Sequence, residues 1–199
     1  FDKSNEKKAI RYERKLEQKA FRLDKQATRK EKRGKEVGDL KERSKELLQS
    51  SQDIRDMRSD TDAEYRFYIS KDLETQYSSE CNELGHTIVN ISAPNFEGKI
   101  HEIRHGGQYA RNELGEKYGV MDEVEAYRAQ YSWKGIYRYF YDDTSESAVM
   151  GRLYAGLDPF IGTINDINLI TPSFVNHLFE NGKYIYPPER ISPIVWNRN

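Results

Sequence analysis

The sequence lacks the features that mark several common classes of protein. Its single cysteine, Cys81, can form neither an internal disulfide nor a cysteine-rich zinc site, which suits a reducing compartment or a secreted protein without disulfides. No apolar run approaches the length of about 18 residues that indicates a transmembrane helix, and no signal peptide is visible. Neither a glycine-rich phosphate loop nor a serine-protease arrangement is present. These absences argue against a disulfide scaffold, a membrane span and a P-loop nucleotide site in this sequence.

Charge is divided unevenly along the 199 residues. Residues 1–60 contain 19 Lys and Arg against 13 Asp and Glu, a net charge of +6, whereas the remaining residues carry a net charge of −7. Both Trp residues and nearly all of the 14 Tyr follow residue 60. We therefore predict two parts, a charged helical arm or linker at residues 1–58 and a globular domain at residues 59–199. Because the chain begins with Phe1 rather than Met, we expect it to be a fragment or a processed product.

The arm has a helical pattern with a break near Gly34 and Gly38. Its apolar residues step by three and four: Ala9, Tyr12, Leu16, Ala20, Leu23, Ala27, Val37, Leu40, Leu47 and Ile54. This narrow stripe predicts one long helix or a two-helix hairpin. Such an arm can bind a coiled-coil partner, a membrane surface or nucleic acid, but we favour a solvated linker. Acidic residues are interleaved with the basic ones, which argues against phosphate binding and leads us to expect no nucleic-acid partner.

A five-residue motif at positions 101–105, His-Glu-Ile-Arg-His, carries the clearest chemical signal. On a helix, His101 and His105 lie on one face, four residues apart, and can bind one metal ion through two imidazole nitrogens. Glu102 lies about 100° round the helix from His101. From there its carboxylate can reach a metal-bound water and act as a general base.

The residues around the motif support a helix. Asn95 is suited to an N-cap, and Phe96 and Ile100 follow helical spacing. Gly106 and Gly107 each cost such a helix about 1 kcal/mol relative to alanine. We interpret them as positions at which another backbone or a substrate approaches the helix closely.

A catalytic zinc usually has three protein ligands and one open position. Glu123 follows His105 by 18 residues, and glycines between them allow the chain to turn and to begin a second helix with Asp122 as N-cap. In an antiparallel helix, Glu123 would lie beside the histidines, and the small Ala126 would allow close packing. Glu125 is the alternative third ligand, and the spacing leaves both glutamates open.

The motif followed by a helix that begins Glu123-x-x-Ala126 resembles the zincin metallopeptidases whose third ligand is glutamate, the gluzincins. The resemblance covers residues 86–135. The short spacing and the run EVEAYRAQ look most like compact bacterial metallopeptidase toxin domains found at the ends of polymorphic, Rhs-type secreted toxins. This resemblance implies a small α+β domain, with the active-site helix and the glutamate helix against a small sheet, behind the helical arm.

The resemblance also implies a function. It implies Zn²⁺ held by His101, His105 and Glu123, with Glu102 as the general base for hydrolysis of peptide bonds. It implies a protein or peptide substrate, secretion or delivery into a target cell, an upstream delivery domain and a cognate inhibitor or immunity protein. The alternatives are a metal-dependent amidase, or an interaction module in which the arm binds a partner and the zinc site is not catalytic. The intact Glu102 argues against a non-catalytic site, because a structural zinc needs no base.

A peptidase also needs a donor to the oxyanion, a role that Tyr, His or Arg fills in zincins. The candidates in this sequence are Tyr127, Tyr131 and His177. In gluzincins an Asp that orients a ligand histidine often follows the ExxA pattern, and Tyr127 occupies that position here.

Hydrophobic and turn patterns predict the remaining elements. They are strands at 65–69 and 86–92, a helix from 122 to about 141, a short helix at 145–155, a strand at 165–170, a helix from Thr171-Pro172 to about 181, and an extended tail over 184–196.

Overall fold

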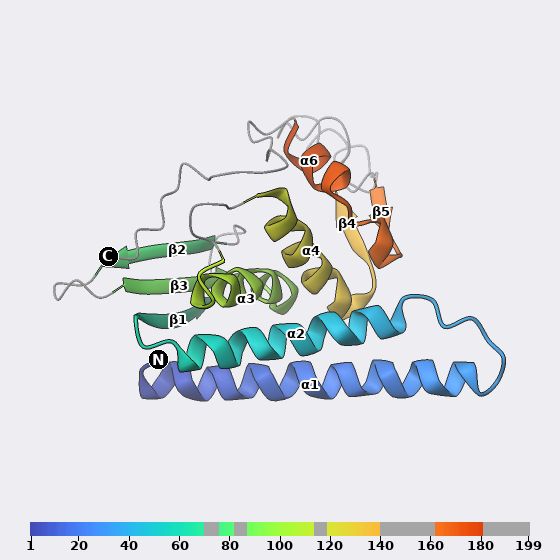
Figure 1. Ribbon diagram of the computed structural model, residues 1–199, viewed down its shortest axis with the longest axis horizontal. Coiled ribbons are helices and arrows are strands. Elements are labelled where there is room, and N and C mark those ends of the chain that lie inside the picture. Colours follow the sequence, from blue (N-terminus) through green and yellow to red (C-terminus); the bar gives the residue numbers. More distant parts are fainter. Residues whose placement is uncertain (70–75, 82–86, 114–118, 140–161, 181–199) are drawn as a thin grey trace, which may run out of the picture.

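The computed structural model describes residues 1–69, 76–81, 87–113, 119–139 and 162–180 (Figure 1). A long helical hairpin runs along one edge of the molecule. Two further helices pack against its second helix, and the first strand of a small sheet contacts its first helix. The prediction of a small α+β fold with a long charged helix at its N-terminus is confirmed. None of the described helices is both long and apolar enough to cross a membrane.

The hairpin consists of α1 (Lys3–Glu31) and α2 (Leu40–Ser59). The Asp2 side chain caps α1 by accepting a hydrogen bond at 2.7 Å from the backbone N–H of Asn5. Between the helices, Gly34 and Gly38 have φ values of +63° and +60°, a left-handed conformation that favours glycine and reverses the chain. Of the two arrangements that the sequence allows, the structure therefore has the hairpin.

Three strands form the main sheet in the order β1-β3-β2. Strand β1 (Ala63–Ile69) pairs in parallel with β3 (Thr87–Ala93), and β2 (Gln76–Cys81) pairs antiparallel with β3. The predicted strands at 65–69 and 86–92 correspond to β1 and β3. Strand β2 is not predicted from sequence, because its segment QYSSEC has few β-branched residues and no clear alternation.

After β3 the chain enters α3 (Phe96–Ala110), which carries the His-Glu-x-x-His motif. The Asn95 side chain accepts a hydrogen bond at 2.8 Å from the N–H of Gly98, so the predicted N-cap is confirmed. This hydrogen bond and the helical span fix both histidines on one helix, as the motif requires.

The next helix, α4 (Val120–Lys134), differs from its prediction at both ends. Its N-cap is Gly119, and Asp122 instead lies in the first turn, where its Oδ2 accepts a hydrogen bond at 2.7 Å from the Gly119 N–H. The helix ends at Lys134 rather than near residue 141, because Gly135 adopts a φ of +76° and stops the helical path.

The chain then forms β4 (Tyr137–Tyr139), which pairs antiparallel with β5 (Gly162–Ile164). The predicted strand at 165–170 is wrong, because the segment forms a single 3-10 turn, η1 (Ile167–Leu169), whose N-cap Asp166 accepts a hydrogen bond from the N–H of Asn168. The predicted helix start is confirmed, since α6 spans Pro172–Glu180. The predicted helix at 145–155 and the predicted extended tail lie outside the described residues.

One hydrophobic cluster joins the hairpin to the rest of the fold. It includes Leu16 of α1 and Leu47 and Ile54 of α2, together with Ile91 of β3 and Ile103 of α3, all fully buried. Residues 1–58 and 59–199, which we predict as arm and domain, thus contribute to the same core.

The close contact of α2 with the back of α3 depends on two glycines. A Cβ atom at Gly107 would lie 2.4 Å from the Cβ of Asp53, and one at Gly106 would lie 2.5 Å from the Sδ of Met57. Both separations are shorter than real side chains allow, so a neighbouring helix approaches at these glycines. The buried Asp53 is also within 2.9 Å of the Nε of Arg104, which ties the two helices by a buried ion pair.

Candidate metal centre

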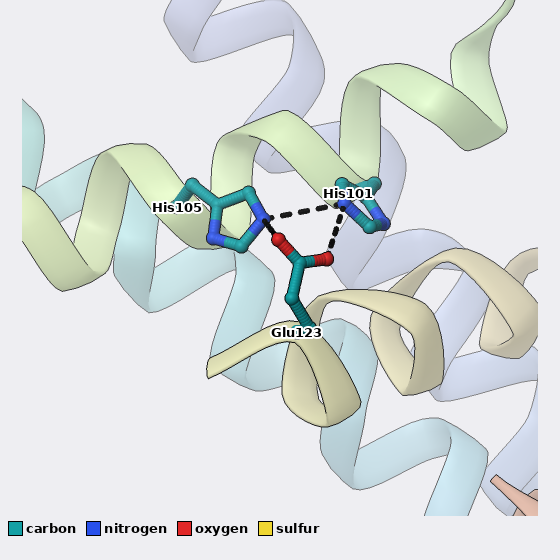
Figure 2. Close-up of side chains that lie close together, drawn as sticks. All are labelled: His101, His105 and Glu123. Carbon is teal, nitrogen blue, oxygen red and sulfur yellow. Dashed lines mark hydrogen bonds and ion pairs between the residues drawn. The ribbon is translucent and has the colours of Figure 1, made fainter. Parts of the chain in front are cut away.

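Three buried side chains from two helices converge on one point (Figure 2). His101 and His105 project from successive turns of α3, and Glu123 reaches them from the first turn of α4. The two Nε2 atoms are 3.2 Å apart. The Glu123 oxygens lie 3.4 Å from each of them, Oε2 from His101 and Oε1 from His105.

These separations fit a tetrahedral metal ion. Two ligand atoms that are each about 2.0–2.1 Å from a zinc ion, at tetrahedral angles, lie about 3.3 Å apart. The 3.2 Å between the two Nε2 atoms is close to that value, and a different oxygen of Glu123 lies 3.4 Å from each of them. One ligand atom from each of the three side chains lies within 4.8 Å of the other two. The cluster of His101, His105 and Glu123 can therefore hold a metal ion.

The charges at the cluster also suit a cation. Burial opposes ionisation of Glu123, but the charge of His105 and hydrogen bonds from both histidines outweigh it and hold the pKa of Glu123 well below its usual range. Burial likewise opposes a charged His105, but the charges of Glu123 and Glu102 prevail and raise the pKa of His105 to about 9. A carboxylate therefore stays ionised beside the two rings, and without a metal ion a proton on His105 balances it.

Gln108 fixes the orientation of His105. Its side chain is fully buried, and its Oε1 lies 2.9 Å from the Nδ1 of His105. An amide oxygen only accepts hydrogen bonds, so Nδ1 carries the hydrogen and the lone pair of a neutral ring is on Nε2, which faces the cluster. The amide Nε2 of Gln108 in turn donates to Glu125 Oε2 at 3.1 Å, which sets the orientation of the amide.

Glu125 therefore lies beside the site and not in it. Its side chain is 48% exposed, whereas that of Glu123 is 7% exposed and within 3.4 Å of both histidines. Of the two glutamates that the sequence leaves open, Glu123 is the one that the fold brings to the cluster.

Glu102 is buried on the same helix, with 4% of its surface exposed. Its charge is one of the causes of the raised pKa of His105, so the two side chains interact electrostatically. Glu102 is not one of the three groups that converge. This agrees with the role of a general base, which lies beside the metal ligands but is not itself a ligand.

Two tyrosines lie on the side of His101. The ring of Tyr127 packs edge-on against that of His101, with centroids 4.6 Å apart, and its hydroxyl is hydrogen-bonded to that of Tyr137. Burial raises the pKa of Tyr137 to about 12, the Tyr127 hydrogen bond lowers it, and the charge of Glu123 raises it. The Tyr137 hydroxyl therefore stays protonated, and the pair retains one O–H hydrogen that is not used between the two tyrosines.

The other predicted oxyanion donors lie elsewhere. The Tyr131 hydroxyl donates at 2.5 Å to Asp39, the N-cap residue of α2, so it serves the packing of the hairpin. His177 lies in α6, but its side chain is outside the described ones. Sequence reasoning missed Gln108, although its position three residues after His105 on one helix was a usable signal. It also missed Tyr137, which falls beyond the true end of α4.

Comparison with known proteins gives no match. No protein-family model, no curated protein and no solved structure is similar to this chain. The interpretation of the site therefore rests on its geometry and its sequence.

Proposed function

We propose that this protein is a zinc-dependent metallopeptidase. The observation that carries the proposal is the convergence of His101, His105 and Glu123, with separations that fit a tetrahedral ion, beside an additional buried glutamate. Two imidazoles and one carboxylate are a ligand set that zinc accepts, and three protein ligands leave one position for water or substrate.

Each residue has a separate role in this proposal. Bound zinc supplies a Lewis acid that polarises the scissile carbonyl and lowers the pKa of water. Glu102 takes the proton of the attacking water and passes it to the leaving amine. In this proposal the pair of Tyr127 and Tyr137 supplies one O–H donor to the oxygen that becomes negative in the transition state, and the contact of the Tyr127 ring with His101 supports this role. Gln108 holds His105 in the tautomer that binds the metal.

The decisive experiment uses Glu102→Gln, which keeps the shape of the side chain but cannot accept a proton at neutral pH. General-base catalysis is worth about 10²–10⁴-fold, so the variant should bind zinc as the wild type does and lose at least about 10²-fold in peptide cleavage. Zinc content would be measured by mass spectrometry and cleavage with a diverse peptide library. The control is Glu97→Gln, which changes the same residue type in the first turn of the same helix.

Three results would contradict the proposal. If His105→Ala retains full zinc occupancy, the ligand assignment is wrong, because loss of one of three ligands should weaken binding at least about tenfold. If wild type and Glu102→Gln cleave equally, Glu102 is not the base. If both are toxic to cells and neither cleaves any substrate, the protein belongs to the class of interaction modules.

The biological setting follows from the resemblance alone and is part of the proposal. We propose a toxin or effector domain that acts on proteins of a target cell and is restrained by a cognate inhibitor. Expression of wild type and Glu102→Gln in the same cells tests this, since growth arrest should follow the wild type only.

A further inference from the structure

The outer face of α1 is a continuous basic surface, although acidic and basic residues alternate along its sequence. The acidic residues of the helix are Glu6, Glu13, Glu17, Asp24 and Glu31. At about 100° per residue these five fall in an arc of only about 40°. The acidic residues that alternate with basic ones along the sequence, and there argue against phosphate binding, therefore lie together on one side of the helix.

That acidic side faces α2 and is neutralised there. Arg58 pairs with Glu6 at 2.7 Å and with Glu13 at 3.1 Å, and Arg55 pairs with both Glu13 and Glu17. At the other end of the hairpin, Lys41 pairs with Glu31, and the charge of Asp24 contributes to the raised pKa of Lys41. The charges of the acidic residues of α1 are therefore balanced by basic residues of α2 within the hairpin.

The basic residues point the other way. Nine of them are exposed, and seven of these nine form the surface that we call the basic stripe: Lys3, Lys7, Arg11, Arg14, Arg22, Lys25 and Arg29. They fall in an arc of about 100° and extend over about 39 Å of helix at 1.5 Å per residue. The other α1 residues in this arc, Ser4, Gln18 and Phe21, carry no charge. Among the described residues, no acidic side chain forms an ion pair with a member of the stripe.

The stripe is straight and widens toward the body of the protein. Helix α1 contains neither glycine nor proline, so nothing in it introduces a kink. Beside the stripe, the Nζ of Lys15 lies 3.6 Å from the centroid of the Phe96 ring, and that of Lys19 lies 5.5 Å from the Trp133 ring. These two cations extend the basic surface onto the flank that carries α3 and α4.

We propose that the basic stripe is a docking surface for an anionic lipid membrane, on which α1 lies flat. A flat membrane surface can contact a straight row of charges along its whole length. The strands of a nucleic-acid duplex wind round their axis once in about 34–36 Å, so a straight rod crosses the phosphate backbones and only part of the stripe meets them. The exposed Phe21, 67% accessible within the arc, adds an aromatic side chain of the kind found at lipid interfaces.

The interaction is electrostatic. The apolar side of α1 is buried against the hairpin core through residues such as Leu16 and Leu23, so the helix does not turn an apolar face to lipid. Each Lys or Arg close to an anionic membrane surface strengthens binding by about fivefold, and the attraction falls off within a Debye length. Docking therefore depends on salt and on several residues acting together.

The experiment measures co-sedimentation of the full chain with vesicles that are about one-third phosphatidylserine, at ionic strengths of about 0.05 M and about 0.5 M. The stripe variant combines Arg11→Gln, Arg14→Gln, Arg22→Gln and Lys25→Gln. The matched control removes the same charge elsewhere by Lys35→Gln, Lys41→Gln, Lys45→Gln and Lys134→Gln. Circular dichroism checks that both variants are folded.

We expect the wild type to bind anionic vesicles at low salt, to be released at high salt and to ignore neutral phosphatidylcholine vesicles. The stripe variant should bind about 10²–10³-fold more weakly, and the control should bind much as the wild type does. Absence of wild-type binding at low salt, or equal losses in the two variants, would overturn the proposal. Tighter binding to duplex DNA or to polyglutamate than to vesicles, at matched charge, would overturn the lipid assignment and give the stripe to that partner. None of these outcomes depends on zinc or on peptide cleavage.

Discussion

The hydrogen bond between His105 and Gln108 gives a quantitative prediction for metal affinity. In Gln108→Leu, a side chain of similar size replaces the amide, and the buried Nδ1–H of His105 loses its acceptor at 2.9 Å. Groups that orient a ligand histidine are typically worth about 10–100-fold in metal affinity, which is about 1.4–2.7 kcal/mol. We expect a loss in this range without loss of the fold.

A pair of further variants distinguishes orientation from general damage. Gln108→Glu keeps an acceptor for the ring but places a second carboxylate about 3 Å from Glu125, where the amide now donates at 3.1 Å. Combining it with Glu125→Gln restores a donor and an acceptor in reversed order. The single variant Gln108→Glu should therefore be less stable than the wild type, and the double variant should recover both stability and zinc affinity.

The assay is competition for zinc against a chromophoric chelator at fixed pH, with circular dichroism to confirm folding. The reasoning is refuted if folded Gln108→Leu binds zinc as tightly as the wild type, because the hydrogen bond then has no role in positioning His105. It is also refuted if the double variant is no better than Gln108→Leu.

Three other predictions follow, two on pH and one on the hairpin. Because the pKa of His105 is raised from 6.5 to about 9, zinc must displace a proton from this residue at neutral pH. The apparent affinity for zinc should therefore rise by about tenfold per pH unit and level off above about pH 9, as chelator titrations would show. The same raised pKa stabilises the metal-free protein fully below pH 6.5, and this contribution should be lost as the pH rises through about 9, as thermal melts would show. Deleting residues 1–59 removes Leu16, Leu47 and Ile54 from the core, and burial of each stabilises the fold by about 1.5–3 kcal/mol. The deletion also removes the buried Asp53, so we expect the truncated chain to be unfolded. A truncated chain that melts cooperatively and binds zinc would contradict this prediction.

The metal cluster is the part of the protein that the sequence predicts best, for a physical reason. Residues four apart on a helix share a face whatever surrounds them, so His101 and His105 needed only a helical segment. Glu123 needed one further condition, an antiparallel helix after a short connection, and the turn glycines indicated it. The choice between Glu123 and Glu125 depended on where α4 begins, and the sequence placed that start three residues late, at Asp122 instead of Gly119.

Features that depend on packing between distant segments were harder to predict. Strand β2 exists because β3 offers it an edge, and its own residues give little sign of it. The apolar stripe of the hairpin is thin, which is typical of a solvated linker. Its burial depends on partners on α3 and the sheet, which the sequence of the hairpin does not contain. The basic stripe of α1 could have been seen by placing the charges on a helix, because it follows from the period of 3.6 residues alone.

Helix α3 has little freedom to change. Every residue from Gly98 to Tyr109 is buried, so the ligand helix faces the metal cluster on one side and α2, through Gly106 and Gly107, on the other. A substitution that suits one side must also fit the packing of the opposite side. Random mutagenesis should therefore tolerate few replacements in this segment, and variants with altered substrate preference should carry their changes in the elements around it.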